Sequence, residues 1–167
     1  MHLLPDEEKL VEAYYWATLS PDPSTQNGAV LYSRAGYLIG TGYNTFPFGI
    51  RHTEERLLNR DKKLMYIEHA ERNCLFSAVR NQSKIESSTL FCPWIACHDC
   101  CRAIVQMGVA RIVGDARLSA GKWMDSIEVG MDILGEAGVK VDFLFEGQPQ
   151  GLLDLTPIRK SGELFYP

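Results

Sequence analysis

The chain has 167 residues, which fits one domain of a size that folds without disulfides or structural metals. Its 46% apolar and 23% charged residues exclude a disordered chain, and no apolar run reaches the ~18–20 residues of a membrane span. We expect no signal peptide at the first residues, and the net charge of −4 argues against a nucleic-acid or membrane-surface partner.

The first half of the chain predicts a helix, a hairpin and a long loop. Pro5 followed by three acidic residues is typical of a helix start. Two strand-like segments flank Arg34-Ala-Gly36, which predicts a hairpin. Asn44 to about Lys63 predicts a loop, and loops of this length are often functional. The predicted elements are a helix over residues 5–19, strands over 28–33 and 37–43, and a short helix over 54–59.

The second half alternates between helical and strand patterns, which favours right-handed crossovers and a partly parallel sheet. Residues 148–167 contain three prolines and no clear period. We therefore expect one domain over residues 1–147 and a C-terminal tail over 148–167. The predicted elements are helices over residues 69–80, 97–107 and 124–136, and strands over 89–94, 111–114 and 139–145.

Five cysteines lie within 28 positions, at 74, 92, 97, 100 and 101. A secreted disulfide scaffold spreads an even number of cysteines over a short chain, so this clustering favours metal or redox chemistry in the cytoplasm. Cys74 lies on an apolar helix face and Cys92 in a strand, so we expect both to be buried as small apolar residues. Cys101 should point about 100° around the helix from Cys100 and pack rather than bind a metal.

Two short segments combine metal-ligand residues with an acid, each where the chain enters a predicted helix. Cys97 and Cys100 are three positions apart, on one face of a first helical turn, where thiolates are stabilised. Together with His69 they supply three zinc ligands and leave a fourth position open for water, as a catalytic site requires. Glu71 is placed to reach that water and to take its proton.

The signature His-x-Glu followed by Pro-Cys-x-x-Cys is typical of zinc-dependent nucleobase deaminases. In this chemistry zinc activates a water that attacks the amidine carbon of the base, and the glutamate transfers the proton. Here Ala96 stands where the signature has proline, which fixes the helix entry but donates no ligand. Two other interpretations of the cysteine pair stay open: a redox pair, and half of a structural zinc site.

The sequence resembles the cytidine and deoxycytidylate deaminase superfamily, and within it the deoxycytidylate (dCMP) deaminases, over about residues 8–145. The resemblance rests on the histidine and cysteine segments and on Gly42-Tyr-Asn-Thr-Phe-Pro-Phe-Gly49, followed by a long insertion before His69. It implies an α/β fold, a three-layer α/β/α sandwich around a five-stranded mixed sheet, and assembly as a homo-oligomer.

The resemblance also implies roles for individual residues. His69, Cys97 and Cys100 match the zinc ligands, and Glu71 matches the proton shuttle. The residues expected to contact substrate are Asn44 at the sugar, Asn73 near the sugar or phosphate, and the backbone of Ala70, Ile95 and Ala96 at the base. Trp94 either shapes the base pocket or belongs to the core.

The residues that bind the substrate phosphate are the part of the site that the sequence specifies least. Relatives commonly carry basic residues in the loop that corresponds to residues 18–27, which here contain no lysine or arginine. We expect a monophosphate to be held by backbone groups, by Ser24 or Thr25, or by arginines such as Arg51 or Arg72. Arg72 has a competing role as a hydrogen-bond donor to the thiolate ligands.

The leading hypothesis is hydrolysis of dCMP to dUMP and ammonia with bound Zn²⁺. The alternatives are deamination of a nucleoside, a free base or an RNA base by the same chemistry, and a non-catalytic zinc-stabilised binding module. Many dCMP deaminases respond to dCTP through a Gly-Tyr-Asn-Gly segment, in which Thr45 replaces the second glycine here. A β-branched residue resists close approach of a ligand to the backbone, so we expect weak activation.

Overall fold

The computed structural model describes residues 5–118 and 124–167. In this part of the chain, no helix is both long enough and apolar enough to cross a membrane. The helices are α1 (Asp6–Ala17), α2 (Glu54–Leu58), α3 (Arg60–Tyr66), α4 (Ala70–Arg80), α5 (His98–Gln106) and α6 (Met124–Glu136), with a short 3-10 helix η1 (Ala116–Leu118). The strands are β1 (Gly28–Tyr32), β2 (Leu38–Tyr43), β3 (Thr89–Phe91), β4 (Arg111–Asp115), β5 (Lys140–Leu144), β6 (Ile158–Lys160) and β7 (Glu163–Phe165).

Five strands form one mixed sheet in the order β2-β1-β3-β4-β5. Strand β1 is antiparallel to both β2 and β3, whereas β3, β4 and β5 run parallel to one another. The parallel strands are joined through α5 and α6, as the alternating sequence pattern predicted. The five-stranded mixed sheet is confirmed.

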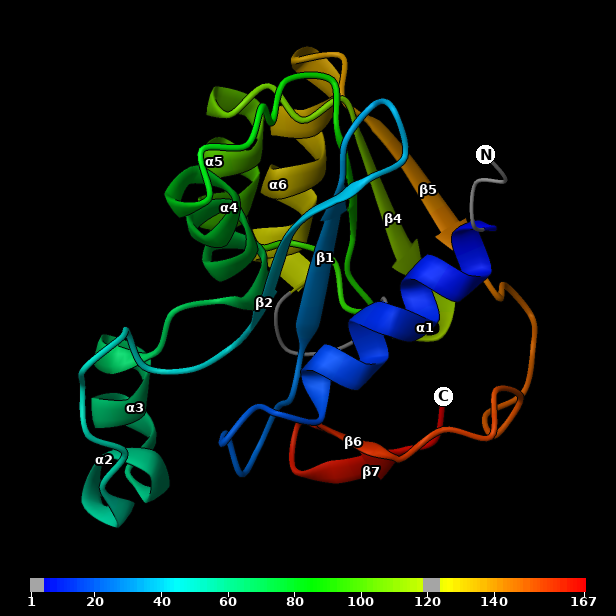
Figure 1. Cartoon of the computed structure of the whole chain (residues 1–167). Helices are drawn as coiled ribbons and strands as arrows, with labels where there is room; N and C mark the ends of the chain where they lie inside the picture. The colour runs from blue at the N-terminus through cyan, green and yellow to red at the C-terminus, as the bar shows by residue number, and fades with distance from the viewer. Residues whose placement is uncertain (1–4, 119–123) are drawn as a thin grey trace.

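Helices cover both faces of the sheet, α1 on one and α4, α5 and α6 on the other (Figure 1). Strand β1 is buried along its whole length, so its alternate side chains pack against the helices on the two faces of the sheet. Val30 belongs to the same buried cluster as Tyr14 of α1, whereas Leu31 belongs to the cluster of Cys74 and Ile104 on the opposite face. This arrangement confirms the three-layer α/β/α sandwich.

Helix α4 lies unusually close to strand β2 because Gly42 has no side chain. A Cβ atom at this position would lie 2.4 Å from the backbone nitrogen of Cys74 and 2.6 Å from the carbonyl oxygen of Ala70. Contacts this short are prohibited, so the glycine sets the distance between the sheet and the helix that carries Glu71.

The insertion before His69 contains two helices, which project from the domain beside the ends of β2 and α4 (Figure 1). The sequence predicted the first, α2, and missed the second, α3. The Asn59 side chain caps α3 by accepting a hydrogen bond of 3.0 Å from the backbone N–H of Lys62. At seven residues, α3 is too short to show a clear helical period.

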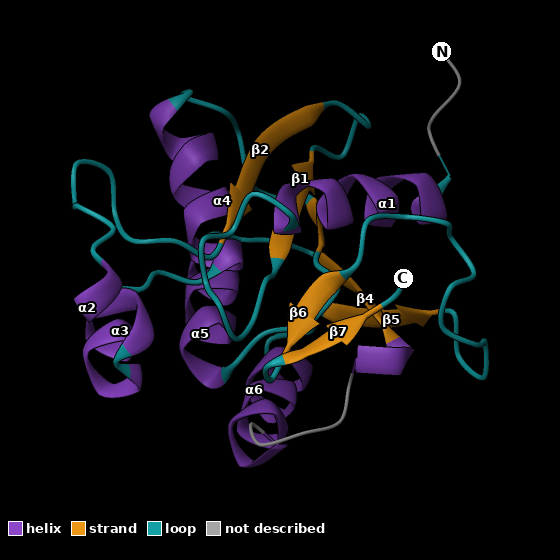
Figure 2. Cartoon of the chain, turned by 90° about the horizontal axis from the view of Figure 1, so that it is seen from below, coloured by secondary structure: helices purple, strands orange, loops and turns teal. Residues whose placement is uncertain are grey.

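Residues 148–167, which we expected to form a C-terminal tail, contain two strands and pack on the domain. Strands β6 and β7 pair as an antiparallel hairpin, which lies below α1 in Figure 1 and is seen from below in Figure 2. Ile158 and Phe165 are 1% and 3% exposed and belong to the buried cluster beneath α1. Each strand has only three residues, so the sequence shows no alternation long enough to detect.

Candidate active site

The three predicted metal ligands come together at the starts of two adjacent helices. His69 is the N-cap residue of α4 and Cys97 is the N-cap residue of α5, while Cys100 lies in the first turn of α5. Their ligand atoms all lie within 4.8 Å of one another, and this is the group of three such donors found among the described residues. The side chains therefore converge from segments 28 and 31 positions apart in the sequence.

The spacing of these atoms fits a tetrahedral metal ion. His69 Nδ1 lies 3.4 Å from Cys97 Sγ and 3.5 Å from Cys100 Sγ. Zinc bound at its usual distances to nitrogen and sulfur places the two atoms about 3.5 Å apart along a tetrahedral edge. Two sulfurs and one imidazole nitrogen also form a donor set that zinc prefers.

Hydrogen bonding prepares one of the two sulfurs as a thiolate. A hydrogen bond with Cys100 lowers the pKa of Cys97 to about 3, and contact with His69 acts in the same direction. The same hydrogen bond, together with burial, raises the pKa of Cys100. Binding of a cation would therefore release the remaining proton from Cys100.

Glu71 lies in the first turn of α4, beside the ligand cluster but not among its ligand atoms. Its side chain is 3% exposed. Burial raises the pKa of the Glu71 carboxyl, although the positive charge of His69 lowers it. A carboxylate in such an environment is suited to accept and return a proton.

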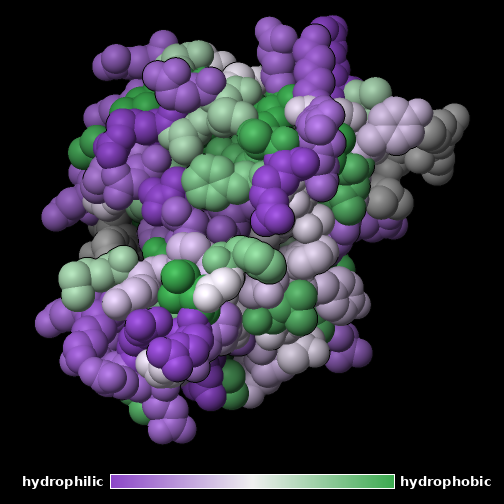
Figure 3. Space-filling view, turned by 60° about the vertical axis from the view of Figure 1, so that its left-hand side comes forward, coloured by the Kyte–Doolittle hydropathy of each residue, from purple (hydrophilic) through white to green (hydrophobic). Residues whose placement is uncertain are grey.

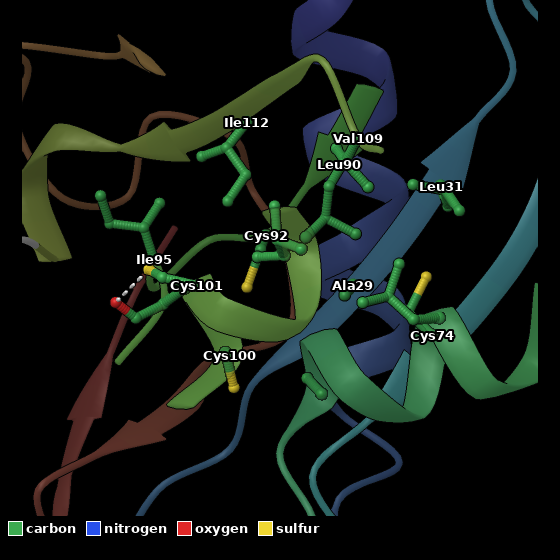
Figure 4. Close-up of a cluster of buried hydrophobic side chains, with 14 of the residues drawn as sticks. Ala29, Leu31, Cys74, Leu90, Cys92, Ile95, Cys100, Cys101, Val109 and Ile112 are labelled. Carbon is green, nitrogen blue, oxygen red and sulfur yellow. Dashed lines mark hydrogen bonds between the residues drawn. The ribbon is translucent and has the colours of Figure 1, made fainter. Parts of the chain in front are cut away.

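The other three cysteines do not belong to this group of ligand atoms. Figure 4 shows the sulfurs of Cys100 and Cys101 on different sides of α5, with Cys101 directed to the carbonyl oxygen of Ala96 at 3.6 Å. Cys74 and Cys92 are fully buried, and burial raises the pKa of both thiols. They belong to the same core cluster as Leu31, consistent with the prediction of a packing role (Figure 4).

A cavity of about 380 Å³ extends from His69, Glu71 and Cys97 toward the insertion. This volume is within the range of about 300–1,000 Å³ that is usual for small-molecule sites. Its walls come from the loop between α1 and β1, from α2 and α3, and from the segment after β3. Trp94 in that segment is 8% exposed and lines the cavity.

Among the residues predicted to contact substrate, Ser24, Thr25, Asn44, Ala70 and Ile95 line this cavity. The structure does not bring Ala96 and Asn73 there. Ala96 is buried and does not line the cavity. Asn73 lines a second cavity instead, and its side-chain amide donates a hydrogen bond of 2.8 Å to the carbonyl oxygen of Tyr43. The Asn73 amide is thus directed to backbone rather than to the ligand cluster.

The side-chain amide of Asn44 also forms hydrogen bonds with backbone groups. It donates a hydrogen bond of 2.7 Å to the carbonyl oxygen of Thr25 and accepts one of 2.7 Å from the N–H of Asn27. Asn44 is only 6% exposed, so in this state it braces the loop between α1 and β1. Contact with a sugar hydroxyl would have to share these hydrogen-bonding groups.

The sequence did not predict most of the residues in the part of the cavity wall that lies outside the ligand cluster, which we call the distal wall. Arg51 and Arg72, considered as phosphate ligands, do not line the cavity, and Arg72 pairs with Glu68. The additional lining residues among those described include Asn27, Leu57, Leu58, Arg60, Lys63, Leu64, Ile67, Ile127 and Ser161. With only seven residues, α3 left no helical period in the sequence that could have identified the residues it contributes.

Comparisons with known proteins agree with this geometry. Residues 5–115 match the model of the cytidine and deoxycytidylate deaminase zinc-binding region. The chain is 30% identical to an "Uncharacterized deaminase in luxG 3'region" of Aliivibrio fischeri, over 75% of this chain and 83% of that protein. It is 29% identical to mouse deoxycytidylate deaminase, over 70% of this chain and 65% of the mouse protein.

A solved structure shows the same fold. The dCMP deaminase of cyanophage S-TIM5, crystallised with dCMP and dUMP, is 26% identical and superposes with a TM-score of 0.67, covering 86% of this chain and all of that chain. The matched region contains the histidine, glutamate and cysteine segments that converge in the structure. The chain therefore belongs to the cytidine and deoxycytidylate deaminase family, a family of hydrolytic deaminases.

Proposed function

We propose that this protein deaminates a cytosine nucleotide, converting dCMP to dUMP and ammonia. The observation that carries the proposal is a cavity of nucleotide size that ends at His69 and Cys97, with the buried Glu71 carboxyl beside them. Similarity to deoxycytidylate deaminases from mouse and cyanophage supports cytosine as the base and a monophosphate as the substrate form.

His69, Cys97 and Cys100 would hold a zinc ion, which the Nδ1–Sγ distances of 3.4 and 3.5 Å fit. When bound, zinc supplies a Lewis acid that makes a water molecule nucleophilic at neutral pH. The protein's task is then to orient the base and to move protons.

Glu71 is the residue that would transfer protons from the attacking water to the base. Its carboxylate takes the proton of the attacking water and delivers it to ring nitrogen N3 as the C4–O bond forms. The second water proton follows the same route to the C4 amino group, the C4–N bond breaks, and ammonia leaves. The ring is left with a C4 carbonyl, and Glu71 returns to its starting state.

The cavity walls are suited to holding a flat base. Ala70, Trp94 and Ile95 line the same cavity as His69 and Cys97. The apolar side chains of Trp94 and Ile95 would displace water from a bound base, which would strengthen the electrostatic interactions of Glu71 with the reacting atoms.

The proposal is tested by metal analysis and ammonia release over a panel of substrates. We expect about one zinc per chain and fastest turnover with dCMP among dCMP, CMP, deoxycytidine, cytosine, an adenine nucleotide and a cytosine-containing RNA. Turnover of the RNA or of a nucleoside in preference to dCMP would replace the substrate assignment. Zinc without any ammonia release would indicate a binding module instead.

We also propose that the protein forms a homo-oligomer. Phe76 and Val79 on α4 are 50% and 51% exposed. Phe48 is 92% exposed, and its ring centre lies 5.6 Å from the guanidinium carbon of Arg80 at the end of the same helix. Apolar patches are visible on this side of the molecule (Figure 3). Exposed apolar clusters are typical of protein interfaces. Analytical ultracentrifugation should give a mass of two or more chains, and Phe76→Glu should reduce it; a mass of one chain would contradict the proposal.

A further inference from the structure

The loop between α1 and β1 has no free backbone amides for a phosphate. The carboxylate of Asp22 already accepts hydrogen bonds from the N–H groups of Ser24 and Thr25, at 2.8 and 3.1 Å. It also accepts one of 2.7 Å from Lys63 Nζ. Since Asp22 is 5% exposed, a phosphate could use these donors only by displacing a buried carboxylate.

The positive charge of Lys63 is likewise compensated within the protein, by an ion pair with Asp22. Lys63 is 6% exposed, and its ammonium group lies against Asp22. Arg60 and Lys63 are the basic residues that line the cavity in the described part of the chain. For Arg60, no ion pair or hydrogen bond occurs within residues 5–118 and 124–167. Its guanidinium group therefore contributes one uncompensated positive charge to the cavity.

The position of Arg60 is fixed by the rest of α3. Positions 60, 63, 64 and 67 all line the cavity, as expected for one face of a helix. The buried pair of Lys63 with Asp22 joins this face to the opposite wall of the cavity. Arg60, one turn before Lys63, is thereby held on the cavity side of α3, in the insertion that projects from the domain (Figure 1).

We propose that Arg60 binds the 5′-phosphate of the substrate and determines the preference for a nucleoside monophosphate over a nucleoside. This inference rests on the proposed function. A guanidinium group offers a planar set of donors that matches phosphate oxygens in a bidentate manner. The phosphate is thus recognised from the insertion, because the loop between α1 and β1 carries no basic residue and its amides are occupied.

The test compares Arg60→Gln with Lys62→Gln. Lys62 lies on the same helix and its replacement changes the charge equally, but it pairs with Glu55 and does not line the cavity. For Arg60→Gln we expect kcat/KM for dCMP to fall about 10- to 100-fold, with deoxycytidine turnover within about twofold of wild type. Lys62→Gln should match wild type with both substrates. Equal losses with both substrates, or no loss with dCMP, would overturn the proposal.

Binding of products separates this inference from the proposed function. Titration of dUMP and of deoxyuridine should show that Arg60→Gln weakens dUMP binding about 10- to 100-fold and leaves deoxyuridine unchanged, with partial recovery in Arg60→Lys. If wild type binds dUMP in this Arg60-dependent way but releases no ammonia from cytosine substrates, the proposed function fails and the phosphate site stands. If dCMP is turned over while Arg60→Gln binds dUMP as wild type does, the phosphate site fails alone.

Discussion

The backbone N–H of Gly162 donates a hydrogen bond of 2.8 Å to the carbonyl oxygen of Ser24. This contact joins the turn of the C-terminal hairpin to the loop at the cavity wall. Gln26 adds two more, donating its N–H to the carbonyl of Arg159 at 2.8 Å and accepting the Arg159 N–H at 3.0 Å through its side chain. Ser161, between the paired residues, lines the cavity. The end of the chain is therefore part of the candidate site.

The hairpin should contribute strongly to stability. Phe165 is 3% exposed, so Phe165→Ala should lower the free energy of unfolding by about 3–5 kcal/mol through lost burial and the cavity left behind. Leu164→Ala is the matched control, since Leu164 is 49% exposed and should change it by less than about 0.5 kcal/mol. Urea unfolding measures both. Equal, small effects would show that the hairpin is not packed on the domain in solution.

Breaking the buried pair of Asp22 with Lys63 should also destabilise the protein. Asp22→Asn leaves a buried ammonium without its partner, and we expect a loss of about 3–5 kcal/mol. Lys63→Met should cost less, because Asp22 keeps the N–H groups of Ser24 and Thr25. The double variant should recover part of the loss in urea unfolding. If the two single variants lose equal amounts that simply add, the pair is not coupled.

Cys100→Ala should abolish tight zinc binding, because His69 and Cys97 alone cannot hold the ion. Cys101→Ala is the control, since its sulfur is directed to the Ala96 carbonyl and should leave the metal content unchanged. The zinc content of each purified variant is measured by elemental mass spectrometry. Full zinc occupancy in Cys100→Ala would remove this residue from the ligand set.

Glu71→Ala should retain zinc and the fold but lose at least ~10²–10⁴-fold in turnover, because proton transfer to the base no longer has a carrier. Glu71→Gln, which preserves the shape of the side chain in its buried site, should be similarly impaired. Turnover of dCMP is measured at matched zinc content. Near-normal rates in either variant would rule out Glu71 as the proton shuttle.

Activation by dCTP should be weak or absent. Thr45 lines the second cavity, where its hydroxyl lies 3.1 Å from Nε2 of His52 and its backbone forms a bridge with Glu68. The side chain occupies space that a glycine would leave to a ligand. Initial rates against dCMP should be near-hyperbolic with and without magnesium–dCTP. A sigmoidal curve shifted strongly by dCTP would contradict this, and Thr45→Gly should then increase the response.

The sequence alone predicted the cluster of metal-ligand side chains and the central layers of this protein. His69, Glu71, Cys97 and Cys100 lie within the first turns of two strongly patterned helices, so local spacing already placed their side chains on common faces. The alternation of helices and strands likewise implied the parallel half of the sheet. These features depend on interactions between near neighbours in the chain, which leave a periodic signal.

Tertiary structure alone decided the distal wall of the cavity. Helix α3 and strands β6 and β7 are too short to leave such a signal. Arg60 and Ser161 lie about a hundred positions apart, yet both reach one cavity because Lys63 pairs with Asp22 and Gly162 bonds to Ser24. Contacts between residues so distant in sequence are fixed by burial and packing of the whole domain, and no local pattern records them.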